Sequence, residues 1–184
     1  MYENILCDVI VISSGAIAFK RFDELEDLIY PLSPVQKTSD KKLKVQCFGN
    51  FDIFDQEGNP VKFARKRSME LFAYLVSKRG SRCTTQELIS TLFYDDESET
   101  KKLNDRFQQA VTSLARGLRN IGAQDVLVRS FKNYAIDVNL VDCDYYHFLE
   151  GDMRAVNAYQ GEFMSQYEWA EFIIGYLEEQ KKIF

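Results

Sequence analysis

Five apolar positions recur at three- and four-residue steps between Leu103 and Leu118, and this stripe constrains the fold more than any other feature. Its members are Leu103, Phe107, Val111 or Ala110, Leu114 and Leu118. Such spacing is typical of an amphipathic helix that buries one face. Ser98 is a candidate N-cap and Gly122 a candidate stop, so we expect one long helix that ends near Asn120.

Two shorter helices are expected before this long one. The segment Ser68–Arg79 places apolar residues on one helical face and is followed by Gly80, a common helix stop. That face consists of Leu71, Phe72, Leu75 and Val76. Thr84-Thr85-Gln86-Glu87 matches a capping box, in which the Thr84 hydroxyl accepts from the Glu87 amide and the Glu87 carboxylate reaches back to Thr84. This box predicts a short helix over Thr85–Leu92.

Segments with strand character flank the three helices. From Leu43 to Ile53 apolar and polar residues alternate, and a turn at Gln56–Asn59 leads into Val61–Phe63, which predicts an antiparallel hairpin or small sheet. A second hairpin is expected from Val126–Ser130 and Tyr134–Val138. The order is therefore sheet, three helices and hairpin, an α+β fold.

This order resembles the winged helix-turn-helix, and the leading sheet narrows the resemblance to the OmpR-type effector domain of response regulators. The resemblance covers about Leu43–Val138 and is strongest in V-T-S-L-A-R-G-L at Val111–Leu118, which is similar to the family signature V-S-x-L-R-x-x-L. It implies that the third helix enters the major groove of double-stranded DNA. The hairpin, or wing, would touch the backbone or minor groove.

The chain beyond the wing resembles the opening of the bacterial transcriptional activator domain found in regulators of the SARP class. The matching segment is A-Y-Q-G-E-F-M-S-Q-Y-E-W-A-E at Ala158–Glu171, with Leu177-Glu178-Glu179 further on. Members of that family continue into several helical repeats, so only the start of the domain is expected here. The resemblances imply an N-terminal segment and linker at 1–42, a winged-helix domain at 43–140 and a helical extension at 141–184.

The N-terminal segment has a weaker signature. Pro31–Lys42 contains two of the three prolines and reads as a linker. Gly15–Phe22, followed by the acidic and apolar Asp23–Ile29, resembles the last strand and helix of a receiver domain. Too little chain precedes it for a whole receiver, so Asp8 is not expected to be a phosphoacceptor. We expect a helix and strand that pack on the effector domain or on a second subunit.

Charge is distributed unevenly along the chain. The formal net charge is −5, yet residues 41–140 carry 17 Lys and Arg against 12 Asp and Glu, whereas both flanking segments are acidic. A basic middle favours an electrostatic docking surface there, although scattered solubilising charge is the alternative.

The resemblance places candidate DNA contacts on the exposed side of the long helix, before the first helix and on the wing. Gln108 and Thr112 are the first candidates for base reading, because glutamine can bind adenine through two hydrogen bonds. The full set is Arg65, Lys66 and Arg67 before the first helix; Lys101, Asn104, Gln108, Gln109, Thr112 and Arg116 on the long helix; and Arg129 and Lys132 on the wing. The helix has fewer arginines than is usual in the family, so a protein-interaction or scaffolding module is the rival interpretation.

Two protein partners are also expected. The acidic loop Tyr94–Glu99 occupies the place where related activators meet RNA polymerase, or it is simply a connection between helices. A homodimer on a repeated or palindromic site is expected, because one small module buries too little surface to be selective in a genome. Aromatic residues in Tyr145–Tyr176, including Trp169, are candidates for the dimer contact or for packing against the winged helix.

Several other functions find little support in the sequence. There is one histidine, His147, no glycine-rich phosphate loop and no nucleophile with a recognisable flanking motif, so no enzyme activity or cofactor is expected. The four cysteines are far apart, which predicts reduced structural thiols and no metal site. No apolar run is long enough to cross a membrane, so a cytoplasmic protein is expected.

Overall fold

The computed structural model describes residues 9–13, 16–20 and 41–184 and divides the chain into two compact units, Met1–Ser39 and Asp40–Phe184. In the first unit, β1 (Val9–Ser13) pairs antiparallel with β2 (Ala16–Lys20). β2 falls inside the segment Gly15–Phe22 that resembles a receiver strand. The predicted helix over Asp23–Ile29, most of the linker and Asp8 lie outside the described residues.

The second unit begins with a small sheet. Strand β3 (Leu43–Gln46) pairs antiparallel with β4 (Asp52–Phe54), and side chains along β3 alternate between buried and exposed. The predicted antiparallel sheet is therefore present, but the prediction of a strand at Val61–Phe63 is wrong: β4 is the partner of β3, and after the turn at Gln56–Asn59 only Pro60 forms a bridge, to Phe54. A third strand, β8 (Val141–Cys143), joins the other edge of β3 in parallel, so the sheet order is β4-β3-β8. Three residues are too few for an alternating pattern, so β8 could not be predicted from the sequence.

Three helices follow: α1 (Lys66–Ser77), α2 (Thr85–Leu92) and α3 (Thr100–Asn120). Every residue of α1 from Leu71 to Ser77 is buried, so α1 is the central helix of the core. It begins two residues earlier than predicted, which places Lys66 and Arg67 inside the helix rather than before it. Gly80 follows with φ +79°, as expected of a helix stop.

The helix caps were predicted with mixed success. At α2 the Thr84 hydroxyl accepts a hydrogen bond of 3.2 Å from the Glu87 amide, as expected. At α3 the prediction of Ser98 as the N-cap is wrong: the cap position is Glu99, and no side chain caps the helix there. The Ser98 amide instead donates to Asp96 Oδ1 at 3.0 Å, because the acidic loop makes its own turn before the helix starts.

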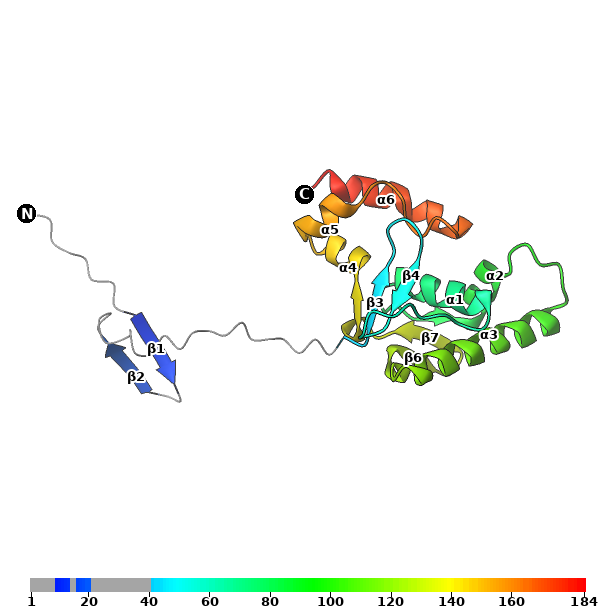
Figure 1. The fold of residues 1–184 in the computed structure, drawn as a ribbon, viewed down its shortest axis with the longest axis horizontal. Helices are drawn as coiled ribbons and strands as arrows, with labels where there is room; N and C mark the ends of the chain where they lie inside the picture. The colour runs from blue at the N-terminus through cyan, green and yellow to red at the C-terminus, as the bar shows by residue number, and fades with distance from the viewer. Residues whose placement is uncertain (1–8, 14–15, 21–40) are drawn as a thin grey trace, which may run out of the picture. The chain divides into compact units, whose positions relative to one another are not determined.

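After α3, the short 3-10 turn η3 (Gln124–Val126) leads into the hairpin of β6 (Leu127–Ser130) and β7 (Asn133–Ile136). β5 (Cys83–Thr84) joins β7, which gives the sheet order β5-β7-β6. The order of sheet, three helices and hairpin is visible in Figure 1. The predicted α+β winged helix-turn-helix is therefore confirmed.

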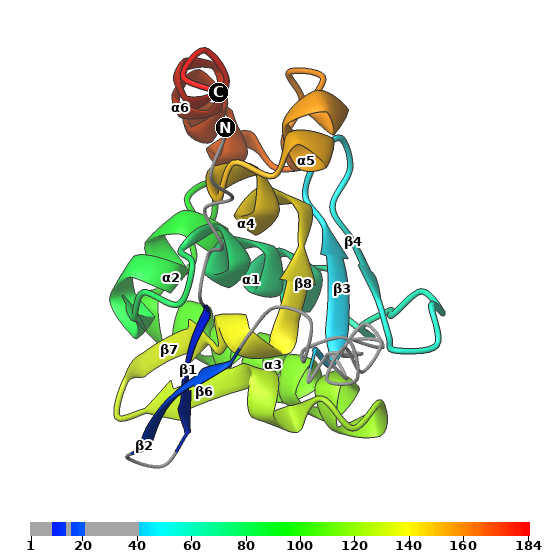
Figure 2. The same cartoon turned by 90° about the vertical axis from the view of Figure 1, so that its left-hand side faces the viewer.

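The C-terminal segment folds onto the sheet. It contains η4 (Val138–Leu140), α4 (Asp144–Leu149), α5 (Met153–Ala158), η5 (Glu168–Ala170) and α6 (Glu171–Lys181). The Met164 amide donates to the Cys47 carbonyl at 2.7 Å, and the Tyr159 ring lies 5.0 Å from that of Phe48. In both views the helices α4 to α6 lie at the end of this unit opposite to α3 (Figures 1 and 2).

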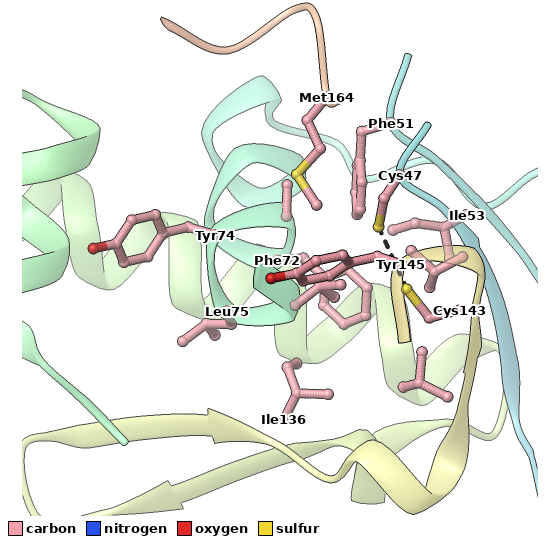
Figure 3. Packing of buried hydrophobic residues seen from close by; sticks show 14 of the residues in the cluster. Cys47, Phe51, Ile53, Phe72, Tyr74, Leu75, Ile136, Cys143, Tyr145 and Met164 are labelled. Carbon is pink, nitrogen blue, oxygen red and sulfur yellow. Dashed lines mark hydrogen bonds between the residues drawn. The ribbon is translucent and has the colours of Figure 1, made fainter. Parts of the chain in front are cut away.

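One hydrophobic cluster connects these parts. Phe72 of α1 lies between Ile136 of β7 and the sheet residues Ile53 and Cys47, with Leu75 to one side and Met164 above them (Figure 3). The extension thus contributes to the same core as the winged helix. Among the described residues, no helix combines the length and the apolar character needed to span a membrane.

Candidate nucleic-acid interface

Helix α3 has one buried face and one open face. Its buried residues are Phe107, Ala110, Val111, Leu114 and Leu118, so Leu103, only half-buried, is the one predicted core position that stays near the surface. The Ser68 hydroxyl of α1 donates to the Ala110 carbonyl at 2.9 Å and holds the two helices together. The opposite face exposes Lys101, Gln108, Gln109, Thr112 and Arg116.

Five of the predicted contact residues line a single open groove. It has a volume of about 590 Å³ and lies between α3 and the segment before α1. Its lining consists of Ala64, Arg65, Gln108, Gln109, Thr112, Ser113 and Arg116. Two side-chain amides, two hydroxyls and two guanidinium groups therefore converge on one surface, which is a mixture suited to base edges and phosphates.

Ser113 and Ala64 were not chosen as site residues from the sequence. The Ser113 Oγ is buried and has no hydrogen-bond partner among the described residues. A buried hydroxyl usually has a partner, so this oxygen is an unpaired polar group in the wall of the groove. Ser113 could have been predicted as a site residue, because it is next to Thr112 on the expected DNA-binding helix.

Gly117 explains why Arg65 lies beside α3. A Cβ atom at Gly117 would meet the Phe63 ring at 2.4 Å, so only glycine lets the segment before α1 approach the helix this closely. Phe63 in turn packs on Phe72 of α1, with ring centroids 6.2 Å apart. The pair thus fixes the distance between Arg65 and Arg116 across the groove.

Arg67 does not lie in the groove. Its guanidinium pairs with Glu70 at 2.7 Å and with Asp95 at 3.8 Å, and it lies 5.3 Å from the centroid of the Phe93 ring. The Asn104 amide donates to the Thr100 carbonyl one turn earlier in α3, at 2.8 Å. Lys66 and Lys101 are exposed, but neither lines the groove.

The wing carries Arg129 on β6 and Lys132 at its tip, both exposed. Arg129 is paired in register with Tyr134, and the Tyr134 ring packs edge-on against Phe107 of α3 at 5.4 Å. Because directly opposed residues of an antiparallel pair point to the same face, Arg129 lies on the α3 side of the hairpin. Cationic side chains therefore occur on both the helix and the wing.

The acidic loop Tyr94–Glu99 is fastened to its surroundings. Asp95 pairs with Arg67, Asp96 with Arg106, and the Tyr94 hydroxyl donates to Glu168 of the extension. Arg106 also lies 5.3 Å from the centroid of the Phe93 ring, as Arg67 does. The remaining charges of this loop, Glu97 and Glu99, are exposed.

A thiol and carboxylate cluster lies in the core between β3 and β8. The Sγ atoms of Cys47 and Cys143 are 3.4 Å apart (Figure 3), and Asp144 lies beside them. The Asp144 oxygens already accept hydrogen bonds of 2.7–3.0 Å from the amides of Cys47, Phe48 and Tyr145. Burial raises the pKa of Cys47 well above its usual value, so this thiol is protonated at neutral pH. The cluster is best explained as the polar anchor between β3 and α4.

The fold and this surface define a winged helix with an open groove beside its third helix. The chain is similar in structure to a solved chain of Mycobacterium tuberculosis EmbR in complex with a low-affinity phosphopeptide, with a TM-score of 0.60 and 20% sequence identity. The similarity covers 78% of this chain but only 43% of the EmbR chain. At that identity it shows a shared fold. No protein-family model and no curated protein matches the chain.

Proposed function

We propose that this protein is a transcriptional regulator that binds specific sequences of double-stranded DNA through α3 and the wing. The observation that carries the proposal is the groove of Arg65, Gln108, Gln109, Thr112 and Arg116, which forms on the open face of α3. The acidic C-terminal helices lie at the opposite end of the unit and leave this face uncovered. The fold shared with EmbR, a SARP-family regulator, supports the same function.

In this proposal α3 lies in the major groove with Gln108 and Thr112 against base edges. Glutamine suits adenine N6 and N7, and the threonine methyl suits the thymine methyl group. Arg65 and Arg116, at the rim of the groove, would neutralise phosphates, while Arg129 would reach the adjoining backbone. Arg67 and Asn104 have other partners and are left out of the contact set.

We further propose that residues 43–140 supply the DNA-binding module of a cytoplasmic protein and that 141–184 brace it. Of the loop Tyr94–Glu99, only Glu97 and Glu99 carry charges without a counter-ion among the described residues, so these two would meet RNA polymerase. Binding as a homodimer remains part of the proposal. Trp169 packs against Tyr74 of the same chain. Phe172 and Tyr176, both exposed, are therefore the aromatic candidates for the dimer contact.

In-vitro selection from random duplexes tests the proposal. The wild-type chain should enrich one site, and its affinity should fall steeply with salt, because phosphate contacts release counter-ions. Gln108→Ala with Thr112→Ala should abolish the sequence preference while the circular dichroism spectrum is unchanged. Gln160→Ala, at an exposed glutamine of the extension, is the matched control and should enrich the wild-type site. Failure of the wild-type chain to bind any duplex at about 50 mM salt would refute the proposal and favour a protein-interaction module.

A further inference from the structure

The tip of the wing presents an exposed aromatic ring between two cations. β6 and β7 are joined by Phe131 and Lys132 alone, and the Phe131 side chain is 85% exposed. Lys132 Nζ lies 5.3 Å from the centroid of that ring, and Arg129 is exposed two residues before it. An apolar ring flanked by positive charge is the arrangement that enters a negatively charged groove.

Hydrogen bonds hold the backbone of this tip in place. The Lys132 carbonyl accepts from the Thr85 amide at 3.0 Å and from the Thr85 hydroxyl at 3.3 Å, which fastens the wing to the start of α2. The Phe131 carbonyl accepts from the Asn133 side chain at 2.8 Å. Lys132 has φ +55°, an unusual conformation that these contacts maintain. The backbone that carries the ring is therefore already ordered, so burial of the ring costs little further conformational entropy.

The wing also packs against α3, the helix that forms one side of the groove. Arg129 lies on the face of the hairpin that packs on α3 through Tyr134 and Phe107. A duplex that lies along the open face of α3 therefore continues toward Arg129 and the tip. In a duplex, the groove next to an occupied major groove is the minor groove.

We propose that Phe131 is an apolar wedge that enters the minor groove beside the α3 site and partly opens one base step. Lys132 and Arg129 would hold the phosphates on either side of that step. This inference rests on the proposed function, since it needs α3 in the major groove. It adds a residue that selects DNA by deformability rather than by hydrogen bonds to bases.

The wedge predicts two properties of the bound DNA. The duplex should bend away from the wing, because inserted side chains kink DNA toward the major groove. Pyrimidine–purine steps should be enriched at the position under the tip, since these steps open most easily. Neither property is expected of a wing that touches phosphates only.

The experiment uses the full chain and a duplex from the selection described above, labelled at its ends for energy transfer and with 2-aminopurine at the step under the tip. Wild type should shorten the end-to-end distance and raise the 2-aminopurine fluorescence. Phe131→Ala should lose both signals and weaken binding about tenfold, with the α3 base preferences kept. Ile183→Ala, at a 72% exposed apolar residue that lies outside the proposed DNA and dimer contacts, is the control and should behave as wild type.

The outcomes separate the two proposals. If wild type binds no duplex, the proposed function fails and the wedge fails with it. If wild type binds its selected site but leaves the duplex straight, or if Phe131→Ala bends it as wild type does, only the wedge is refuted. Loss of polymerase recruitment with unchanged bending would assign Phe131 to a protein contact and likewise refute the wedge.

Discussion

The indole of Trp169 packs edge-on against the ring of Tyr74, with centroids 5.1 Å apart and planes at 86°. Tyr74 lies on the central helix α1 and Trp169 on η5 of the extension, so this contact joins the two parts of the second unit. Trp169 also stacks on Tyr167 at 5.5 Å. Trp169 therefore packs against the winged helix, which is one of the two roles expected for it from the sequence.

Trp169→Ala should lower the free energy of unfolding by about 3 kcal/mol, because a large ring is removed from a packed site. Urea titration followed by circular dichroism measures the loss. One cooperative transition is expected, since the extension and the winged helix share a core. Ile183→Ala, at a 72% exposed side chain, should change the value by less than about 0.5 kcal/mol. A separate early transition in wild type would show that the extension unfolds independently.

The carboxylate of Glu87 makes stability depend on pH. Burial raises its pKa, but hydrogen bonds from Lys78 and Tyr74 outweigh this and lower the pKa below the usual 4.5. A carboxyl group with a lowered folded pKa stabilises the protein above its unfolded pKa, and the contribution is lost as the pH falls through the folded value. Glu87→Gln should therefore lower stability at pH 7 by less than about 1 kcal/mol and by less still at acid pH, because the site is partly exposed.

Urea titrations at neutral pH and below the folded pKa provide the comparison. Glu97→Gln, in the exposed loop, is the control and should show little difference from wild type at either pH. If Glu87→Gln lowered stability equally at both pH values, the ionised carboxylate would not contribute to stability.

Local features of this fold could be predicted from the sequence, whereas contacts between distant segments could not. The cap at Thr84 and the bounds of α2 follow from neighbouring residues, and both were predicted correctly. The approach of Phe63 to Gly117 joins residues that are far apart in the chain, and no local pattern indicates it. The same holds for the pairing of Arg67 with Asp95, which removes a predicted DNA contact from the site. A sequence pattern predicts which face of a helix is buried, but it does not show which residue elsewhere in the chain pairs with a charged side chain.

The two arginines at the start of α1 should differ in their effect on DNA binding. Arg65→Ala should reduce the slope of log affinity against log salt by about 1, because one phosphate contact is lost. Arg67→Ala should leave the slope unchanged and lower the free energy of unfolding by about 1 kcal/mol, since it removes a cation from the Phe93 ring and from Asp95. Filter binding over a salt series measures the slope for each variant. Equal slopes would show that lining the groove does not decide which of the two arginines contacts a phosphate.

The buried cysteines should resist alkylation in the folded protein. Burial raises the pKa of Cys83 to about 11 and that of Cys47 well above its usual value, so the reactive thiolate is scarce at pH 8. In a Cys7→Ser variant, mass spectrometry after iodoacetamide should show slow modification of Cys47, Cys83 and Cys143, all of them buried. The rate should rise sharply across the urea transition. Rapid modification of one of these thiols without urea would mean that this part of the core opens locally.

Gly117 and Gly175 provide a matched pair of helical glycines with opposite expectations. Alanine favours a helix over glycine by about 1 kcal/mol, so an unhindered substitution is stabilising. A Cβ at Gly175 in α6 meets nothing within 4 Å, and Gly175→Ala should raise the free energy of unfolding by up to about 1 kcal/mol. A Cβ at Gly117 would overlap the Phe63 ring, with its Cδ1 at 2.4 Å and its Cε1 at 2.7 Å.

Gly117→Ala should therefore lower the free energy of unfolding by about 1–3 kcal/mol, because the Phe63 ring must move out of its site against Phe72. Adding Phe63→Leu should recover part of that loss, since a smaller side chain leaves room for the new methyl group. The displaced segment carries Arg65, so Gly117→Ala should also weaken DNA binding while Gly175→Ala leaves it unchanged. If Gly117→Ala were as stable as Gly175→Ala, the approach of Phe63 to α3 would not be what positions the groove.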